Sequence, residues 1–361
     1  MAKVAELPLT EAARADARRL RVHGNSWLWV GGGVVFALAA LLTGIVVGPA
    51  PVGIGAIVES AASHIPFLGF HSHLSASDSA IVWQLRLPRV VLGLLVGAML
   101  SCAGATYQGV FRNPLVDPYL LGVAAGAGLG ATLMIAYAPG AAFNGDFLPL
   151  AAFAGGCGAV VIAYAIGRSS TRGTATLVLA GVTVTAFLTA IQTFVQQQHQ
   201  STLQAVYSWI LGSLDTAGWH DVLLLLPYAG VSGVLLLLHR RVLDVMTLGD
   251  EEASALGLNV GRIRLLLVAA ATLGTAGAVA VSGLIGFLGI IVPHFVRLVA
   301  GSSYRIVLPL SLLVGGGFLA FTDILARTII SPAELPIGVV TAFFGAPFFA
   351  VVLRTGRSVG P

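Results

Sequence analysis

The fold is decided by residues 85–118, which read LRLPRVVLGLLVGAMLSCAGATYQGVFRNPLVDP. No charged residue occurs between Arg89 and Arg112, and a run of this length meets the requirement of about 20 mostly apolar residues for a membrane-spanning helix. Pro88 suits the first turn of such a helix, where its missing N–H costs nothing. Pro114 and Pro118 stop this helix and allow a second one to start. We therefore expect two membrane helices joined by a tight turn.

Similar apolar runs recur along the whole chain. Of the 361 residues, 57% are hydrophobic and only 9% are charged, far fewer than the roughly 25% of charged residues in a soluble domain. The mean hydropathy is +0.93. These features predict an all-α, polytopic membrane protein with about ten transmembrane helices. The predicted spans are 27–48, 88–110, 115–138, 147–167, 174–198, 219–238, 263–284, 286–301, 306–326 and 336–354.

The basic residues predict the orientation. Residues 1–26 hold Lys3 and several arginines before the first apolar run, which places the N-terminus in the cytoplasm. Alternating the spans from there leaves all but three of the 19 basic residues on the cytoplasmic side. We expect a multi-pass membrane protein with both termini cytoplasmic. Its parts are an N-terminal segment (1–26), a transmembrane domain (27–354) and a tail (355–361).

Several classes of function are disfavoured. The formal charge of +4 does not indicate nucleic acid, because the arginines never form a run. Cys102 and Cys157 both fall inside predicted spans, as small buried side chains would, so we predict neither a disulfide framework nor a metal site. Lys3 is the only lysine, so the chain lacks a phosphate-binding P-loop, and any ATP would bind to a separate subunit. No nucleophile–base pair indicates an enzyme.

Glycines spaced four apart allow close helix packing in a membrane. One such row holds Gly122, Gly126 and Gly130, and a second holds Gly93 and Gly97. We expect these rows to pack the subunit internally. The alternative is a seam between two subunits.

Five segments in order resemble the permease family of the type II ABC importers, whose members import cobalamin, haem and iron–siderophore complexes. They are LRLPR, RNPLVDPYLLGVAAGAGLGA, LGDEEASALGLNVGRIR, SGLIGFLGIIVPHFVRLVAG and DILARTIISPAELPIGVVTAFFGAPFF, spread over about residues 80–355. The resemblance implies a homodimer around a central translocation pathway. It also implies two cytoplasmic ATPase subunits that bind ATP and Mg, a periplasmic binding protein that delivers the ligand, and no cofactor bound permanently to the permease.

A cytoplasmic loop at about 243–262 is expected to contact the ATPase. Asp250, Glu251 and Glu252 favour the start of a short helix, and Gly257 favours its end. The resemblance makes this the coupling helix, and the alternative is an ordinary amphipathic connector. The residues assigned to coupling are Leu248, Gly249, Asp250, Glu251, Ala253, Leu256 and Gly257.

The resemblance also implies gates and a pathway. The inner gates correspond to Asn113 and Leu115, and to Gly173, Thr174 and Ala175; Gly173 and Ala175 depart from the serine or threonine that the family often has. The pathway would be lined by 174–198 and 337–353. Gln192 and Gln196, near the outer end of the first of these, either face the ligand or belong to a solvated helix end.

Three basic residues break the charge pattern on the outer side, namely Arg86, Arg89 and Arg327. The resemblance implies that they dock glutamates of the binding protein, and the alternative is that they anchor lipid headgroups. Asp323 is the one acid well inside a predicted span. Since it precedes Arg327 by one helical turn, we expect a structural ion pair. We read His294 as structural too.

The transported ligand is expected to be haem, with a ferric siderophore or cobalamin as alternatives. Histidines on the outer side could ligate haem iron transiently, although each alone is typical of a surface residue. They are His64, His71, His73, His199 and His220. A more distant alternative is an ion-driven secondary transporter, for which Asp323 alone is weak support.

Overall fold

The computed structural model describes residues 26–63, 74–142, 146–168 and 174–355, and these residues form helices and turns without any strand. Each predicted span corresponds to a helix. Seven helices of the described part are long and apolar enough to cross a membrane, while α6, α15 and α17 are shorter. The matching helices are α2 (Ser26–Val46), α5 (Leu87–Phe111), α6 (Val123–Tyr137), α8 (Phe147–Arg168), α9 (Thr174–Gln198), α11 (Trp219–Leu238), α14 (Val260–Ser282), α15 (Leu288–Ala300), α16 (Tyr304–Thr328) and α17 (Ile337–Thr355).

Two predicted boundaries are wrong. Helical structure begins well before Pro88, because α4 (Ala76–Ala80) and the π-helix η2 (Ile81–Arg86) run directly into α5, and Ser75 caps this start by accepting a hydrogen bond from the Asp78 N–H (3.0 Å). The helix predicted from 115 begins only at Val123, because the two prolines extend the turn. The remaining short helices are α3 (Ile54–Ser63), α7 (Pro139–Ala142), η3 (Gln200–Thr202), α10 (Leu203–Ile210), α12 (Arg240–Met246) and α13 (Asp250–Ala255).

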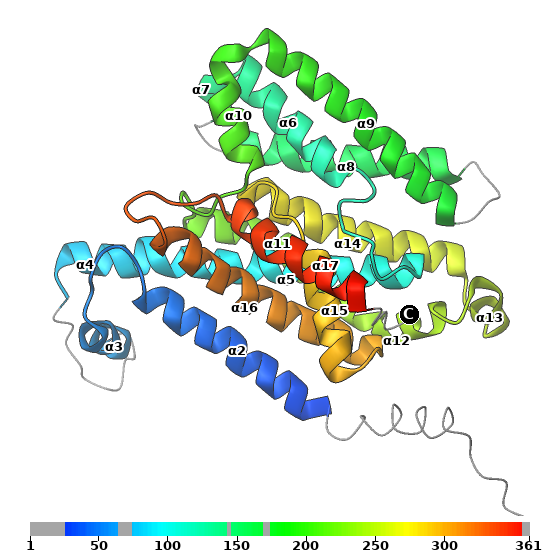
Figure 1. The fold of residues 1–361 in the computed structure, drawn as a ribbon, viewed down its shortest axis with the longest axis horizontal. Coiled ribbons are helices and arrows are strands. Elements are labelled where there is room, and N and C mark those ends of the chain that lie inside the picture. Colours follow the sequence, from blue (N-terminus) through cyan, green and yellow to red (C-terminus); the bar gives the residue numbers. More distant parts are fainter. Residues whose placement is uncertain (1–25, 64–73, 143–145, 169–173, 356–361) are drawn as a thin grey trace, which may run out of the picture.

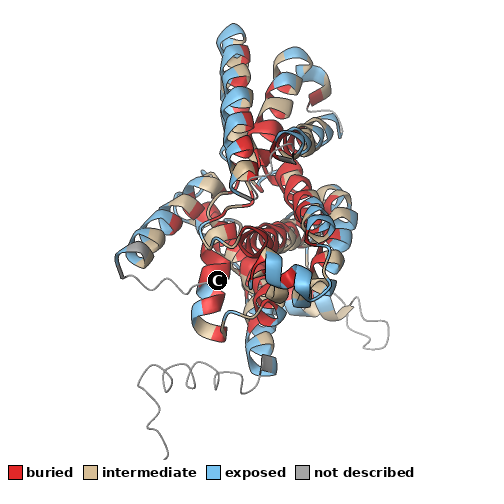
Figure 2. Ribbon diagram, turned by 90° about the vertical axis from the view of Figure 1, so that its right-hand side faces the viewer, coloured by how far each residue is buried: buried red, intermediate tan, exposed pale blue. Residues whose placement is uncertain are grey.

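Helix α5 forms the centre of the subunit. It packs against α11, α14, α15 and α16, and its side chains are buried along most of its length. Figure 2 shows the buried residues concentrated around this centre. Helices α6, α8 and α9 pack on one another as a second group, and α2 covers α16 on the opposite side (Figure 1). The segments that precede and follow α5 are more exposed, with Leu85 and Leu115 at 59% and 46%.

The glycine rows pack inside the subunit, as predicted. A Cβ atom on Gly126 would overlap the Gly155 carbonyl oxygen of α8. A Cβ atom on Gly97 would overlap the Gly315 carbonyl oxygen of α16 in the same way. The small residues thus let α6 approach α8, and α5 approach α16, at backbone contact.

Substituting leucine for Gly126 is expected to destabilise the subunit by about 1–3 kcal/mol, because the added side chain overpacks the α6–α8 contact. Gly158 lies on α8, but a Cβ atom there would meet nothing within 4 Å. Gly158→Leu is therefore the matched control. Thermal unfolding of the detergent-solubilised variants measures the difference, and equal melting temperatures would refute the packing role of Gly126.

Candidate functional site

The turn after α5 is held by its own side chains. Arg112 ends the helix in the left-handed conformation, with φ 51° and ψ 40°. Asn113 Oδ1 then accepts a hydrogen bond from the Leu115 N–H (2.9 Å), and Asp117 Oδ1 accepts one from the Tyr119 N–H (2.8 Å). Short polar side chains bonded to the backbone two residues on are typical of tight turns. Burial raises the pKa of Asp117 to about 6.

This turn and the start of α9 enclose a common cavity of about 480 Å³. The structure therefore brings together Asn113 and Ala175, one residue from each gate that the resemblance implies. Thr174 is the first residue of α9, and Gly173 lies outside the described residues. Leu115 is 46% exposed and does not line the cavity. The lining residues are Phe111, Arg112, Asn113, Pro114, Val116, Ala175 and Val178.

A buried polar clamp holds this gate turn, defined as residues 112–118, against α15. Gln108 Nε2 donates hydrogen bonds to the carbonyl oxygens of Gly289 (3.0 Å) and Val116 (3.3 Å). Arg297 Nη2 in turn donates to Gln108 Oε1. Gln108 and Arg297 are 1% and 4% exposed. Arg297 lies in the last turn of α15, and its buried side chain provides the hydrogen bond that Gln108 Oε1 accepts.

The predicted coupling helix is present as α13, Asp250–Ala255. It begins after Gly249 (φ 139°), and Gly257 (φ 86°) follows its end, as the sequence predicted. Ala253 is fully buried, whereas Leu248 and Leu256 are 62% and 65% exposed. Helix α13 therefore presents apolar side chains at both of its ends to the surroundings, which is typical of a contact surface.

Asp250 joins α13 to two other segments. Arg264, in the first part of α14, donates from Nη2 to both carboxylate oxygens of Asp250 (2.9 and 2.8 Å). Arg112, at the end of α5, lies 3.3 Å from Asp250 through its Nη2. Helix α13 is thus in direct ionic contact with the gate turn.

At the end of the subunit that the charge pattern predicts to face outward, two of the three unusual arginines cap α2. Arg86 Nη1 donates to the carbonyl oxygens of Ile45 and Val46 (both 3.1 Å), and Arg327 Nη2 donates to that of Gly44 (2.6 Å). The last carbonyl groups of a helix lack partners within it, and cations are favoured there. Both arginines therefore stabilise the end of the first span.

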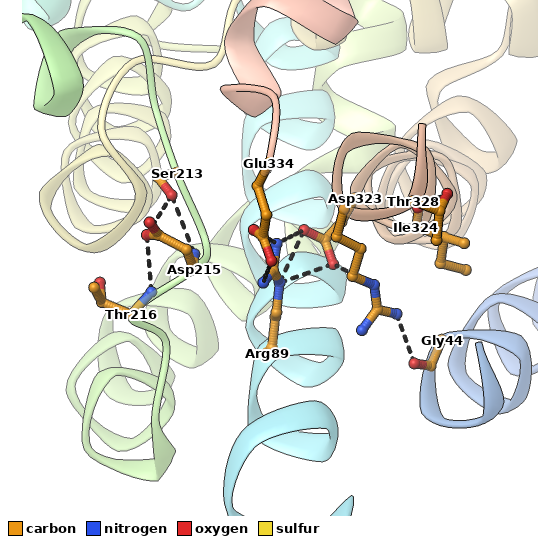
Figure 3. A network of polar contacts seen from close by, with 10 residues as sticks. Gly44, Arg89, Ser213, Asp215, Thr216, Asp323, Ile324, Thr328 and Glu334 are labelled. Atoms are coloured by element: carbon orange, nitrogen blue, oxygen red, sulfur yellow. Dashed lines mark hydrogen bonds and ion pairs between the residues drawn. The ribbon is translucent and has the colours of Figure 1, made fainter. Parts of the chain in front are cut away.

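Arg89 lies between two carboxylates, as Figure 3 shows. Its Nη2 is 2.7 Å from Asp323 Oδ1 on α16 and 2.7 Å from Glu334 Oε2 in the segment before α17. Asp323 also lies 3.6 Å from Arg327 Nε, which confirms the predicted structural ion pair at i,i+4. This outer network of Arg89, Asp323, Arg327 and Glu334 ties α5 and α16 to the segment before α17.

Docking of the binding protein by these three arginines stays a prediction, although all three side chains are largely buried in the subunit. Arg86 and Arg327 are 5% and 2% exposed, and the Arg89 side chain is 12% exposed. Their guanidinium groups turn inward because carbonyl and carboxylate oxygens of the subunit itself satisfy them. All three reach only the wall of an outer cavity of about 280 Å³, together with Asp215 and Glu334.

Comparison with known proteins agrees with this geometry. The family model described as the FecCD transport family matches residues 36–355. The chain belongs to the FecCD transport family. This family consists of the permease subunits of type II ABC importers, membrane components without an ATPase site of their own. The predicted family and the predicted all-α, polytopic fold are thereby confirmed. The chain is an integral membrane permease.

The relatives of this FecCD permease are named for different substrates. An uncharacterized ABC transporter permease protein of Bacillus subtilis, YvrB, is 38% identical and covers 94% of this chain and 98% of its own. The cobalamin permease BtuC of Halobacterium salinarum is 36% identical (90% and 95%), and the hemin permease HmuU of Yersinia pestis is 38% identical (80% and 88%). A solved metal-chelate type ABC transporter in an inward-facing conformation superposes with a TM-score of 0.79 at 27% identity, covering 90% and 98%.

The other residues predicted to contact the ligand of the FecCD permease stay predictions. Gln192 of α9 is 9% exposed and lies beside Gly128 of α6, and Gln196 is half-buried. His199 stacks edge-on against Tyr137, and His220 lies 3.2 Å from Asp146. The other outer histidines lie outside the described residues. Among the residues that the structure does describe, no group of three or more His, Cys, Asp and Glu could hold a metal ion.

Sequence reasoning missed Gln108, Arg112, Arg264 and Arg297 as parts of the site. Gln108 was visible as a polar residue inside an otherwise apolar run, and such residues in a span are functional candidates. The arginines gave a weaker signal, since Arg112 lies between two predicted spans and Arg264 and Arg297 lie near the ends of two others. His294 is 4% exposed, and its ring lies 6.3 Å from that of Phe348, in keeping with the structural role predicted for it.

Proposed function

We propose that two copies of this chain form a homodimer around a central pathway and import haem across the bacterial inner membrane. Partner ATPase subunits bind ATP and Mg on the cytoplasmic side, where both termini also lie. A periplasmic binding protein delivers the ligand to the outer face, around the outer cavity. The three arginines of that face bind groups of the subunit itself. Arg86 and Arg327 bind the end of α2, and Arg89 binds the carboxylates of the outer network.

The observation that carries this proposal is the meeting of gate and coupling elements at one end of the subunit. The cavity between the gate turn and α9 is lined by Arg112, whose guanidinium also contacts Asp250 of α13. Exposed leucines flank α13. An apolar surface beside a ring of charges suits insertion into a cleft of a cytoplasmic partner. Motion imposed on α13 would therefore reach the gate.

The choice of haem is supported by the helices that would line the pathway. Helix α9 exposes Leu179, Phe187 and Phe194, and α17 exposes Phe343. Apolar and aromatic surfaces of this kind suit a flat, largely apolar ring system. They are a poor match for the small oxyanion named for a molybdate permease of Haemophilus influenzae, which is 34% identical. A ferric siderophore or cobalamin remains the alternative cargo.

The rival function, ion-driven secondary transport, is opposed by the state of Asp323. A coupling ion needs an ionisable group in the span that is free to bind and release it. Asp323 is 2% exposed and is held by both Arg89 and Arg327. Its carboxylate is therefore already paired within the subunit and is not free to bind a coupling ion.

The test is uptake into proteoliposomes that contain the permease, its ATPase and its binding protein. We expect haem uptake only with hydrolysable ATP, and no ATP hydrolysis by the purified permease alone. Ferric siderophore and cobalamin are offered in parallel to the same vesicles. Uptake of one of these without haem uptake would overturn the cargo, whereas uptake driven by an ion gradient without ATP would overturn the importer itself.

A further inference from the structure

The link between the coupling helix and the gate turn has two unequal parts. Arg264 holds Asp250 through both carboxylate oxygens, and its side chain is only 15% exposed. Arg112 reaches the same carboxylate at 3.3 Å, with its own side chain 34% exposed. Both Arg264 contacts come from one nitrogen atom, Nη2, and they are shorter (2.8 Å against 3.3 Å) and better shielded from water than the Arg112 contact. Partly buried ion pairs are screened less than exposed ones. Arg264 therefore holds α13 to α14 more firmly, and Arg112 makes the looser contact, which a displacement of α13 can strain or break.

The backbone of Arg112 is unusual as well. Its φ of 51° lies in the left-handed region, where only one other non-glycine residue of the described chain has a positive φ, namely Phe287. Glycine is the ordinary residue at this position after a helix, and any other residue there is strained because its Cβ atom comes too close to the following carbonyl oxygen. Strain of this kind concentrates at functional positions. A glycine would remove the strain, but it would also remove the guanidinium that contacts Asp250.

Arg112 also has the right position to act on the gate. Its side chain lines the gate cavity beside Asn113. The backbone N–H of Asn113 donates back to the Gln108 carbonyl oxygen (3.1 Å), so the residue that meets α13 is continuous with the turn that closes the cavity. No other residue that lines this cavity has an ion pair with α13 in the described structure.

We propose that Arg112 is a positioning residue that transmits movement of the coupling helix to the gate turn. The ATPase displaces α13 with Asp250, Arg264 keeps α13 in register with α14, and the Arg112 guanidinium follows Asp250 and moves the turn. This inference rests on the proposed importer function. It adds a named residue through which ATP hydrolysis and opening of the inner gate are coupled.

The experiment measures ATP hydrolysed per haem transported by the complete complex in proteoliposomes. In Arg112→Asn the new residue tolerates the left-handed backbone but lacks the charge, and Arg112→Gly removes strain and charge together. For both variants we expect the ratio to rise about tenfold, within the range of typical coupling between two sites. Arg112→Lys keeps the charge and should stay close to wild type.

Arg305→Gln is the matched control, because it removes one cytoplasmic arginine whose side chain is 62% exposed and lies 3.7 Å from Asp244. A wild-type ratio in both uncharged variants would overturn the inference. So would loss of the ATPase subunit from the purified complex or a lowered melting temperature in both, since either would show a purely structural role. If the wild-type complex shows no ATP-dependent uptake, the proposed function itself fails, which is a distinguishable result.

Discussion

Replacing Arg89 with methionine is expected to destabilise the subunit by about 3–5 kcal/mol, the cost of breaking a buried ion pair by removing one partner. Asp323 is 2% exposed and would keep only the longer contact with Arg327 (3.6 Å). Glu334 would lose its ion pair as well, which frees the segment before α17. Thermal unfolding of the solubilised subunit, measured beside its yield from the membrane, checks this expectation.

Two further variants separate charge from packing in this test. In Arg89→Met with Asp323→Leu no buried charge is left unpaired at Asp323, so much of the stability should return, as for other buried pairs replaced by apolar side chains. Arg305→Met removes an exposed arginine and should change stability by about 0–1 kcal/mol. If Arg89→Met unfolds at the temperature of Arg305→Met, the outer network contributes little and the arginine is available to a partner after all.

Reversing the charge of Asp250 together with Glu251 should reduce transport by about 100-fold, near the upper end of typical coupling between sites. Asp250→Arg places a cation against both Arg264 and Arg112, which now hold the native carboxylate. Like charges in contact would push α13 away from α14 and from the gate turn. Glu251→Arg changes the exposed first turn of the same helix. Haem uptake by the reconstituted complex is the measurement.

The matched control for this pair is Arg241→Glu, which reverses an exposed charge on the neighbouring α12. It should retain wild-type uptake. Melting temperature and ATPase association are recorded for every variant, so that uncoupling is separated from misfolding. Wild-type uptake by the double variant would refute the assignment of α13 as the coupling helix.

The positions of the helices followed largely from local sequence. The predicted spans 174–198 and 219–238 have the same bounds as α9 and α11, because an apolar run between polar or turn-forming residues specifies a helix by itself. Helix α13 was also predicted from local sequence, because acidic residues stand at its start and a glycine follows its end. The errors were in two helix starts. The cap at Ser75 lets helical structure begin before α5, and the two prolines of the gate turn delay the start of α6 to Val123.

The roles of the charged side chains did not follow from local sequence. Arg86, Arg89 and Arg327 were recognised as exceptions to the charge pattern, yet their predicted partner was a separate protein. Their partners in the folded subunit are far away in sequence, with 234 positions between Arg89 and Asp323 and 283 between Arg327 and Gly44. The same holds for the gate turn, since Arg297 lies 189 positions from Gln108.

The sequence by itself therefore determined that this protein is a helical membrane permease, where most of its helices lie and where the short helix α13 begins and ends. Hydropathy and helix-end chemistry depend on neighbouring residues, so they can be read directly from the sequence. Only the tertiary structure decided that Arg86, Arg89 and Arg327 bind groups of the subunit itself and that Asp250 joins α13 to Arg112. A guanidinium takes whichever oxygen atoms the packing of the helices brings within reach, and that packing depends on contacts spread over the whole chain.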